Sequence, residues 1–418
     1  MMQRKRGVMA LGLIWLLTFL CLLISIIKYT LGAILKWSVP GAKVSKDYAF
    51  QPTVSVVLPC YNEGKTVYDS IESISRSNYP SDKFEVIAQD DCSVDDSYQW
   101  ILKAQRDFTG IRVRADRNAV NSGKARTVCN ALAHSNAEVI ISVDSDCIFD
   151  PDAIRELTAC FSEPNMGAVG GRVGVNNPND GIITAIQTFV YYAAFHLYKV
   201  PENWTRSVGC ISGCLFAIRR ELMLKLEPQI RSRHWFGIPV NQGEDRFLTH
   251  MTLLEGYGTY LNHDALCWTN VPTTLNELFK QQLRWRRSIL RDFFFTLKTL
   301  PRHVFKLHPN AVLHLVITPL GAVVAVLMAV TILAGDPMAW AGPSPVVAYL
   351  VIAAVLAWAI RRYSVRETVK NPLAMGAYAA WWLVSHLFIT PLALCTLDSR
   401  DWGTRSKEQE ASLVHTND

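Results

Sequence analysis

The sequence lacks the short motifs that mark the commonest nucleotide-binding and redox folds. Its 418 residues contain no Gly-x-x-x-x-Gly-Lys loop and no Gly-x-Gly-x-x-Gly segment, which argues against a P-loop ATPase and a dinucleotide-dependent dehydrogenase. The ten cysteines include no Cys-x-x-Cys pair, so buried, reduced thiols are the simplest explanation for them. The sequence also has no internal repeat and no low-complexity segment. These absences favour a reducing, cytosolic setting for the central part of the chain.

Charge is scarce as well. Charged residues make up 19% of the chain, whereas hydrophobic residues make up 50%. The formal net charge of +6 is modest, and many of the lysines and arginines flank apolar stretches. Such a distribution favours contact with anionic membrane lipid, and nucleic acid is not expected as a partner.

Long hydrophobic runs, in contrast, occur at both ends of the chain. A bilayer is crossed by about 20 apolar residues in a helix. Four stretches are predicted to be membrane helices: residues 8–27, 311–335, 346–360 and 373–397. A signal peptide is the alternative for the first stretch, but its apolar part is too long and no cleavage site follows it. We therefore expect a multi-pass protein of the cell membrane.

The resulting domain organisation has five parts. We expect an N-terminal anchor and linker over residues 1–50, a cytosolic catalytic domain over 51–272, amphipathic interface helices over 273–310, a C-terminal transmembrane region over 311–400, and a final motif and tail over 401–418.

Strand and helix patterns alternate in the central domain. Strand patterns cover residues 53–58, 84–88, 111–115 and a run from Val139, and helical patterns cover 65–75, 95–105 and 122–134. This alternation predicts an α/β fold with a parallel, doubly wound sheet. Ligands of such sheets bind beyond the carboxyl ends of the strands.

The fourth of these strands ends in two carboxylates. Asp144 and Asp146 are one residue apart, so on an extended chain they share a face and are suited to holding one Mg²⁺ or Mn²⁺ ion. Aspartates also form turns and helix caps, as the following Asp150-Pro151-Asp152 would. Both interpretations of the pair therefore stand on the sequence.

Three further side chains lie at or beyond predicted strand ends and suit a nucleoside diphosphate. Tyr61 can stack on a base, and Asp91 can accept a hydrogen bond from a pyrimidine ring or a ribose. Lys124 follows a glycine at a predicted helix N-terminus, where the helix dipole favours phosphate. Each of the three, taken singly, also has a structural explanation.

Two later groups complete the candidate site. Asp245 begins a predicted helix and is the candidate general base, whereas the helix dipole alone explains the neighbouring Glu244. Gln281, Arg284 and Trp285 lie on one face of a helical stretch, where they are suited to a diphosphate and a sugar ring. The same stretch has the basic, amphipathic character of a helix at a membrane surface.

These motifs, in this order between apolar segments, resemble the processive inverting glycosyltransferases of the hyaluronan, chitin and cellulose synthase group. Within that group the segments 212–215 and 236–240 and the terminal run 402–405 are most similar to hyaluronan synthases, with the nodulation chitin-oligosaccharide synthases close behind. The resemblance implies a nucleotide-binding glycosyltransferase domain of the GT-A-like type joined to a membrane pore.

The resemblance also implies roles on the donor side. Asp91 corresponds to a uridine-binding aspartate and Lys124 to a diphosphate-binding lysine. Asp144 and Asp146 correspond to the carboxylates that bind the metal and the diphosphate of a UDP-sugar. Cys92 departs from the family, in which glycine is usual at this position.

On the acceptor side, Asp245 corresponds to the general base, and Ser212 and Gly213 to a substrate-binding loop. Gln281, Arg284 and Trp285 correspond to the motif that binds the acceptor end and the leaving diphosphate. Cys214 stands where this loop usually has proline, which bears on the sugar that is accepted.

The function expected from the resemblance is polymerisation of UDP-sugars into an exported polysaccharide, from UDP-N-acetylglucosamine with or without UDP-glucuronate. The alternative is a chitin-oligosaccharide synthase that uses UDP-N-acetylglucosamine alone. A non-processive glycosyltransferase should lack the Gln-x-x-Arg-Trp motif, and a transporter or receptor would bind UDP-sugar without releasing UDP. A retaining glycosidase fits less naturally beside a membrane pore.

Overall fold

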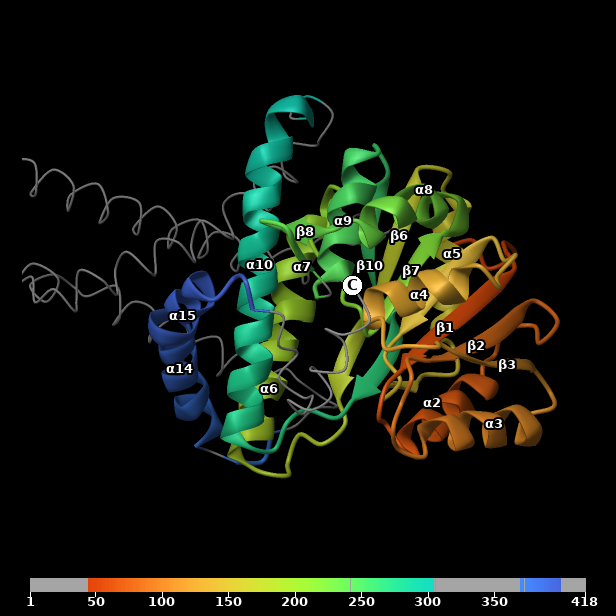
Figure 1. Ribbon diagram of the computed structural model, residues 1–418, viewed down its shortest axis with the longest axis horizontal. Helices are drawn as coiled ribbons and strands as arrows, with labels where there is room; N and C mark the ends of the chain where they lie inside the picture. Colours follow the sequence, from red (N-terminus) through yellow and green to blue (C-terminus); the bar gives the residue numbers. More distant parts are fainter. Residues whose placement is uncertain (1–43, 241, 304, 306–368, 372, 400–418) are drawn as a thin grey trace, which may run out of the picture. The chain divides into compact units, whose positions relative to one another are not determined.

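The computed structural model describes residues 44–240, 242–303, 305, 369–371 and 373–399 (Figure 1). The chain divides into two compact units. The described part of the first, the sheet unit, comprises residues 44–176 and 202–270. The second, the helical unit, comprises residues 177–201 and the described residues from 271 onward. The helix α7 (Lys199–Trp204) runs across the division.

The sheet unit contains one eight-stranded sheet with the order β3-β2-β1-β4-β7-β6-β10-β5. Its strands are β1 (Val54–Cys60), β2 (Phe84–Asp90), β3 (Arg112–Arg117), β4 (Val139–Val143), β5 (Ile148–Phe149), β6 (Met166–Val175), β7 (Leu215–Arg219) and β10 (Gly258–Thr269). A separate hairpin joins β8 (His234–Trp235) and β9 (Ile238–Pro239).

The helices of this unit follow the strands. They are α2 (Thr66–Ser75), α3 (Ser97–Asp107), α4 (Lys124–Leu132), α5 (Ala153–Ala159), the 3₁₀ turn η2 (Cys160–Ser162), α8 (Arg220–Arg231) and α9 (Glu244–Leu254). In α2 the buried Val67, Ile71 and Ile74 recur at helical spacing, so this helix has one apolar face. The predicted helix and strand positions from residue 53 to Val143 agree with the structure to within two or three residues.

The parallel part of the sheet creates the site. β1 pairs in parallel with β2 on one side and with β4 on the other, so the order of strands reverses at β1. β1 is fully buried, as expected for a central strand covered on both faces. In open α/β sheets the crevice beyond such a reversal is where ligands bind.

The prediction of a parallel sheet is wrong for the second half. β7 runs antiparallel to both β4 and β6, and β5 runs antiparallel to β10, so the sheet is mixed. Between β6 and β7 the chain passes through residues 177–201 of the helical unit, so β7 does not follow directly from the preceding strand. The five residues of β7 do not by themselves indicate in which direction the strand runs.

The helical unit is all α in its described residues. It contains α6 (Ile182–Tyr192), the π-helix η3 (Ala193–Tyr198), α10 (Leu275–His303), α14 (Ala374–Val384), the π-helix η4 (Ser385–Ile389) and α15 (Thr390–Cys395). Phe189 of α6, Leu278 of α10 and Tyr378 of α14 belong to one buried apolar cluster. Arg291 of α10 donates three hydrogen bonds to the carbonyl oxygens of Leu397 and Ser399, just after α15.

Three of the four predicted membrane helices, 8–27, 311–335 and 346–360, lie outside the described residues. The fourth, 373–397, corresponds to α14, η4 and α15. Across the residues that the structure describes, no helix has both the length and the apolar character needed to cross a bilayer.

Candidate active site

Carboxylates converge at the carboxyl ends of β1 and β4. Asp144 and Asp146 follow β4, as predicted, and Asp146 accepts a hydrogen bond from the Thr269 hydroxyl at 3.0 Å. Burial, and after it the charge of Asp144, raises the pKa of the Asp146 carboxyl. The charged form of Asp146 is therefore disfavoured at this site.

A third carboxylate, Glu63, was not among the residues predicted from the sequence. It follows β1, and its backbone N–H donates to the Ser97 hydroxyl at 2.8 Å. Burial, with the charges of Asp146 and Asp144 next, raises the pKa of Glu63 to about 8. Its position directly after a buried parallel strand was the available signal. Tyr61 was the only residue of that loop predicted to be functional.

Tyr61 itself is half-buried at the end of β1. Its predicted stacking on a base remains a prediction.

Lys124 lies between the carboxylate of Asp144, after β4, and that of Glu244, at the start of α9. At the first residue of α4 it forms a salt bridge with Asp144, and its ammonium lies 3.3 Å from a carboxylate oxygen of Glu244. Burial lowers the pKa of Lys124, but Asp144 and Glu244 more than offset this and hold the pKa well above its usual value. The ammonium is therefore charged. Glu244, which the helix dipole alone was expected to explain, also has this partner.

Gly213 lies between Lys124 and the candidate base. Its backbone N–H donates to the Asp245 carboxylate at 3.0 Å, and its carbonyl oxygen lies 3.5 Å from the Lys124 ammonium. A Cβ at this position would lie 2.8 Å from the ammonium and 3.4 Å from the Asp245 Cβ, so a larger residue would displace the Lys124 ammonium. Ser212 lies beside it and its carbonyl oxygen accepts the N–H of Leu215, which closes the turn into β7.

The same loop is tied to α9. The Thr249 hydroxyl accepts the Ile211 N–H at 3.1 Å and donates to the Asp245 carbonyl oxygen at 2.7 Å. Gly243, before the first residue of α9, has a φ of 71°, a left-handed conformation that favours glycine. These contacts hold Asp245 and the loop of Ser212 and Gly213 in one place.

Asp91 lies at the end of β2, where the structure gives it a clear local role. It is 2% exposed and accepts hydrogen bonds from the Asn118 side chain and from the backbone N–H groups of Ser122 and Gly123, at 2.7 to 2.8 Å. These contacts shape the loop that enters α4. A carboxylate offers about four acceptor positions, so its predicted contact with uridine stays compatible with this role.

A small cavity lies under the loop and α9. Its volume is about 20 Å³, close to that of one water molecule, so it is too small for a nucleotide. Most of its lining is apolar, with Glu244 and Asp245 as the charged members.

Gln281, Arg284 and Trp285 lie on α10 of the helical unit, which confirms that they share a helix. The Trp285 ring lies against Tyr191, with ring centroids 6.2 Å apart. The side-chain amide oxygen of Gln281 is buried and has no hydrogen-bond partner among the described residues. A buried acceptor left in this state costs free energy unless a ligand supplies a donor.

Comparison with known proteins gives a consistent result. The sequence profile of the family described as "Glycosyltransferase like family 2" matches residues 52–288. An N-acetylglucosaminyltransferase of Mesorhizobium japonicum is 29% identical over 362 residues, which cover 85% of this chain and 82% of that protein. A hyaluronan synthase of Streptococcus pyogenes is 28% identical over 362 residues, which cover 85% of this chain and 83% of that protein.

The fold is also similar to a solved structure. This is the mannosyltransferase PcManGT from Pyrobaculum calidifontis in complex with GDP-Man and Mn²⁺, with a TM-score of 0.57 and 20% identity. The similarity covers 91% of this chain and 99% of that one. At this identity the likeness concerns the fold alone, which is an α/β, GT-A-like Rossmann-type domain with a mixed sheet.

Proposed function

The chain belongs to glycosyltransferase family 2 and is an inverting nucleotide-sugar transferase, and we propose that it polymerises UDP-sugars into an exported polysaccharide. The observation that carries this proposal is the chain of contacts from Asp144 through Lys124 and Gly213 to Asp245. It connects a group suited to the donor diphosphate with a group suited to the acceptor hydroxyl.

The donor would lie over the carboxylates after β1 and β4. Burial, and after it the charges of neighbouring aspartates, raises the pKa values of Asp146 and Glu63, and such a group of buried carboxylates fits a divalent cation. Asp144 and Asp146 would hold Mg²⁺ or Mn²⁺, and the bound ion would neutralise charge on the diphosphate. The mannosyltransferase of similar fold was solved with Mn²⁺. Tyr61 and Asp91 would contact the nucleoside.

Asp245 is suited to the role of base because its carboxylate is fixed by Gly213 and α9. It takes the proton of the acceptor hydroxyl as that oxygen attacks the anomeric carbon. The new glycosidic bond forms on the face opposite the departing UDP, which leaves with the electron pair of the broken bond and inverts the carbon. A positioned base contributes about 10² to 10⁴ in rate.

Lys124 and the α10 motif would serve the charged leaving group. The Lys124 ammonium is charged and already close to Asp144, so a shift toward the diphosphate oxygens requires no change of protonation. Arg284 would pair with the leaving diphosphate, and Trp285 would stack on the acceptor sugar. The buried, unpartnered oxygen of Gln281 supports a ligand near this motif.

The donor is UDP-N-acetylglucosamine together with UDP-glucuronate in our main proposal, which makes the product hyaluronan-like. The similarity to N-acetylglucosaminyltransferases favours the alternative, a chitin oligosaccharide made from UDP-N-acetylglucosamine alone. In both cases the growing chain must leave through protein, because hydrocarbon cannot satisfy its hydroxyl groups. We therefore propose a multi-pass protein of the cell membrane, with its catalytic domain in the cytosol and membrane lipid around its apolar segments.

The test uses the full chain, purified in detergent and in lipid, with each UDP-sugar supplied singly and together. UDP release is measured, and the product is digested with a hyaluronan-specific lyase or a chitinase. Polymer that requires both donors supports the hyaluronan-like product, and chitinase-sensitive polymer from one donor supports the alternative. UDP-sugar binding without any UDP release overturns both.

The Asp245→Asn variant tests the base. It should bind UDP like the unmodified chain but release UDP from UDP-sugar at least about 10²-fold more slowly. The exposed Asp264→Asn is the matched control and should keep its activity. Normal turnover in Asp245→Asn would remove Asp245 from this role.

A further inference from the structure

Three thiols gather directly behind the acidic site. Cys147 follows Asp146, Cys214 ends the Gly213 loop, and Cys267 lies on β10. The Cys147 thiol donates to a carboxylate oxygen of Asp146 at 3.5 Å, and the Cys267 thiol donates to the Cys214 carbonyl oxygen at 3.9 Å. Cys147 and Cys267 are completely buried, whereas Cys214 is half-buried.

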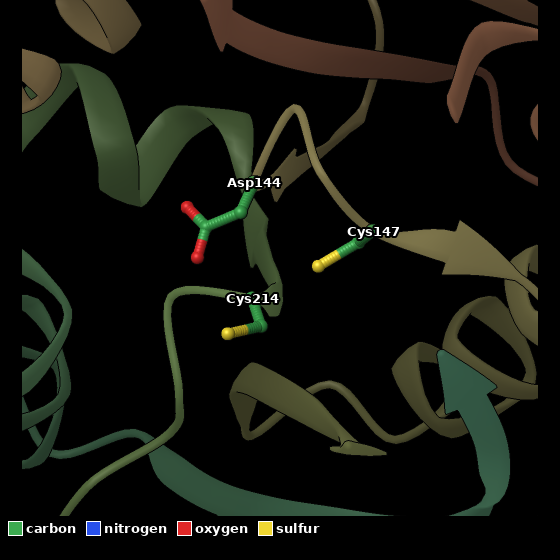
Figure 2. Close-up of side chains that lie close together, drawn as sticks. All are labelled: Asp144, Cys147 and Cys214. Atoms are coloured by element: carbon green, nitrogen blue, oxygen red, sulfur yellow. The ribbon is translucent and has the colours of Figure 1, made fainter. Parts of the chain in front are cut away.

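A carboxylate completes this group on its open side. A carboxylate oxygen of Asp144 and the sulfur atoms of Cys147 and Cys214 all lie within 4.8 Å of one another (Figure 2). The Asp144 side chain is 31% exposed, so a small ion can reach the group from that side. Within the described residues, this is the one set of His, Cys, Asp and Glu side chains that meets such a distance limit.

The spacing is close to that of a tetrahedral metal centre. With Zn–S bonds of about 2.3 Å, two sulfur ligands of one Zn²⁺ lie roughly 3.8 Å apart. Contraction by about 1 Å, within reach of side-chain rotation, would therefore convert the group into a ligand set. Two sulfurs and one oxygen select thiophilic ions such as Zn²⁺ or Cd²⁺, whereas Mg²⁺ and Mn²⁺ prefer oxygen.

We propose that Asp144, Cys147 and Cys214 form a three-ligand binding site for a thiophilic divalent cation. Binding replaces the protons of two thiols, which pass to solvent, with two metal–sulfur bonds, and no electron is transferred. The site differs from the proposed Mg²⁺ or Mn²⁺ site in its sulfur ligands. It shares Asp144 with that site.

The shared carboxylate gives the site a consequence that rests on the proposed function. A thiophilic ion bound beside the sulfurs would occupy a carboxylate oxygen of Asp144 and add positive charge next to the proposed diphosphate–metal site. Zn²⁺ should therefore inhibit sugar transfer in competition with Mg²⁺ or Mn²⁺. The binding itself is independent of any activity.

The direct test uses the full chain, reduced, freed of metal and titrated with Cd²⁺ alone. A stoichiometric cadmium–thiolate absorption band in the ultraviolet is expected. The variants Cys147→Ser and Cys214→Ser should each weaken Cd²⁺ binding at least tenfold and reduce the band. Cys129→Ser is the matched control, because Cys129 is as buried as Cys147 but lies on α4 outside the group.

Three results would overturn the site: no band, a band that survives both serine variants, or an equal loss in Cys129→Ser. Thermal unfolding identifies a variant that fails to fold, and Cys214→Pro, the residue usual in the resembled family, then replaces Cys214→Ser. Asp144→Asn should weaken Cd²⁺ binding but keep the thiolate band.

The activity arm compares each variant with its own rate without Zn²⁺. The Cys147→Ser/Cys214→Ser chain should need at least tenfold more Zn²⁺ for half inhibition of UDP release. A thiolate band in a protein without transferase activity would leave the cation site intact and reject the proposed function. Sugar transfer without a thiolate band would reject the cation site and leave the proposed function intact.

Discussion

Two aspartate pairs lie on either side of β1, and they differ in how the chain treats their charge. Asp90 and Asp91 end β2, whereas Asp144 and Asp146 follow β4. Both pairs lie at carboxyl ends of parallel strands, and both fit a ligand site by sequence alone. The structure separates them by their hydrogen bonds.

The first pair is engaged by the chain itself. The Arg117 side chain lies 2.9 Å from an Asp90 oxygen, and Asp91 accepts three hydrogen bonds from the loop before α4. The second pair has fewer such donors, chiefly the Lys124 ammonium at Asp144 and the Thr269 hydroxyl at Asp146, and a third carboxylate, Glu63, lies beside it. Carboxylates that accept many hydrogen bonds from the chain, as in the first pair, stabilise the fold. Carboxylates that lie beside other carboxylates, as in the second pair, are available to bind a cation.

The largest expected difference between the pairs is in activity. Asp146→Asn keeps a carbonyl oxygen for the Thr269 hydroxyl but removes one charge, so UDP release should fall by at least about 10²-fold. The melting temperature of the metal-free variant should not fall, because the substitution removes one of several neighbouring, partly buried negative charges. Asp264→Asn is the control, and turnover of Asp146→Asn within tenfold of the unmodified chain would contradict the assignment.

The next largest effect is on stability. Asp91→Ala leaves the N–H groups of Ser122 and Gly123 without their acceptor, which should cost about 1 to 3 kcal/mol of unfolding free energy. Thermal or denaturant unfolding measures this loss, with the exposed Asp82→Ala as control. An unchanged midpoint for Asp91→Ala would show that the contrast between the two pairs is wrong.

Much of the first half of the sheet could be predicted from sequence. The strands around Val57, Ile87 and Ile141 are short runs of buried, mostly β-branched residues between turn signals, and Gly123 marks the start of α4. Parallel pairing then brings their carboxyl ends to one edge. Asp144, Asp146 and Lys124 could be predicted as site residues because they lie at that edge.

The other features of the fold and the site depend on contacts between residues far apart in sequence, which the local sequence does not indicate. Glu63 and Glu244 could equally be solvated glutamates at a loop and a helix start, and only the folded chain brings them to Asp146 and Lys124. The direction of β7 depends on its pairing with β4. The thiols of Cys147 and Cys214 come from segments far apart in sequence, so their proximity needed the structure.

The third prediction concerns pH and the second pair. The folded-state pKa of Glu63, about 8, is above its unfolded value, so its contribution to stability is present below about pH 4.5 and is lost as the pH rises through 8. In chelator, the melting temperature should therefore decrease between pH 5 and 8 more steeply for the unmodified chain than for Glu63→Gln. Parallel slopes for the two proteins would contradict the carboxylate cluster, and Glu255→Gln, a partly exposed glutamate elsewhere in the sheet unit, is the control.

The smallest effect concerns the backbone beside the first pair. Cys92 has a φ of 62°, a left-handed conformation that costs a residue with a Cβ roughly 1 kcal/mol, and the resembled family usually has glycine here. Cys92→Gly removes this cost but adds freedom to the unfolded chain, so its net stabilisation should be at most about 0.5 kcal/mol. Cys92→Ala keeps the cost and loses the contact of the thiol with the Ala119 carbonyl oxygen.

The comparison between these two variants isolates the conformation. The Cys92→Gly variant should have an unfolding free energy about 1 kcal/mol higher than Cys92→Ala, which denaturant unfolding measures. At most other positions alanine is the more stabilising residue. Equal stabilities would mean that the turn relaxes around Cys92. The turn positions Asp91 for its contacts with the α4 loop, so the sign of this difference also tests whether the fold around the first pair is held rigidly.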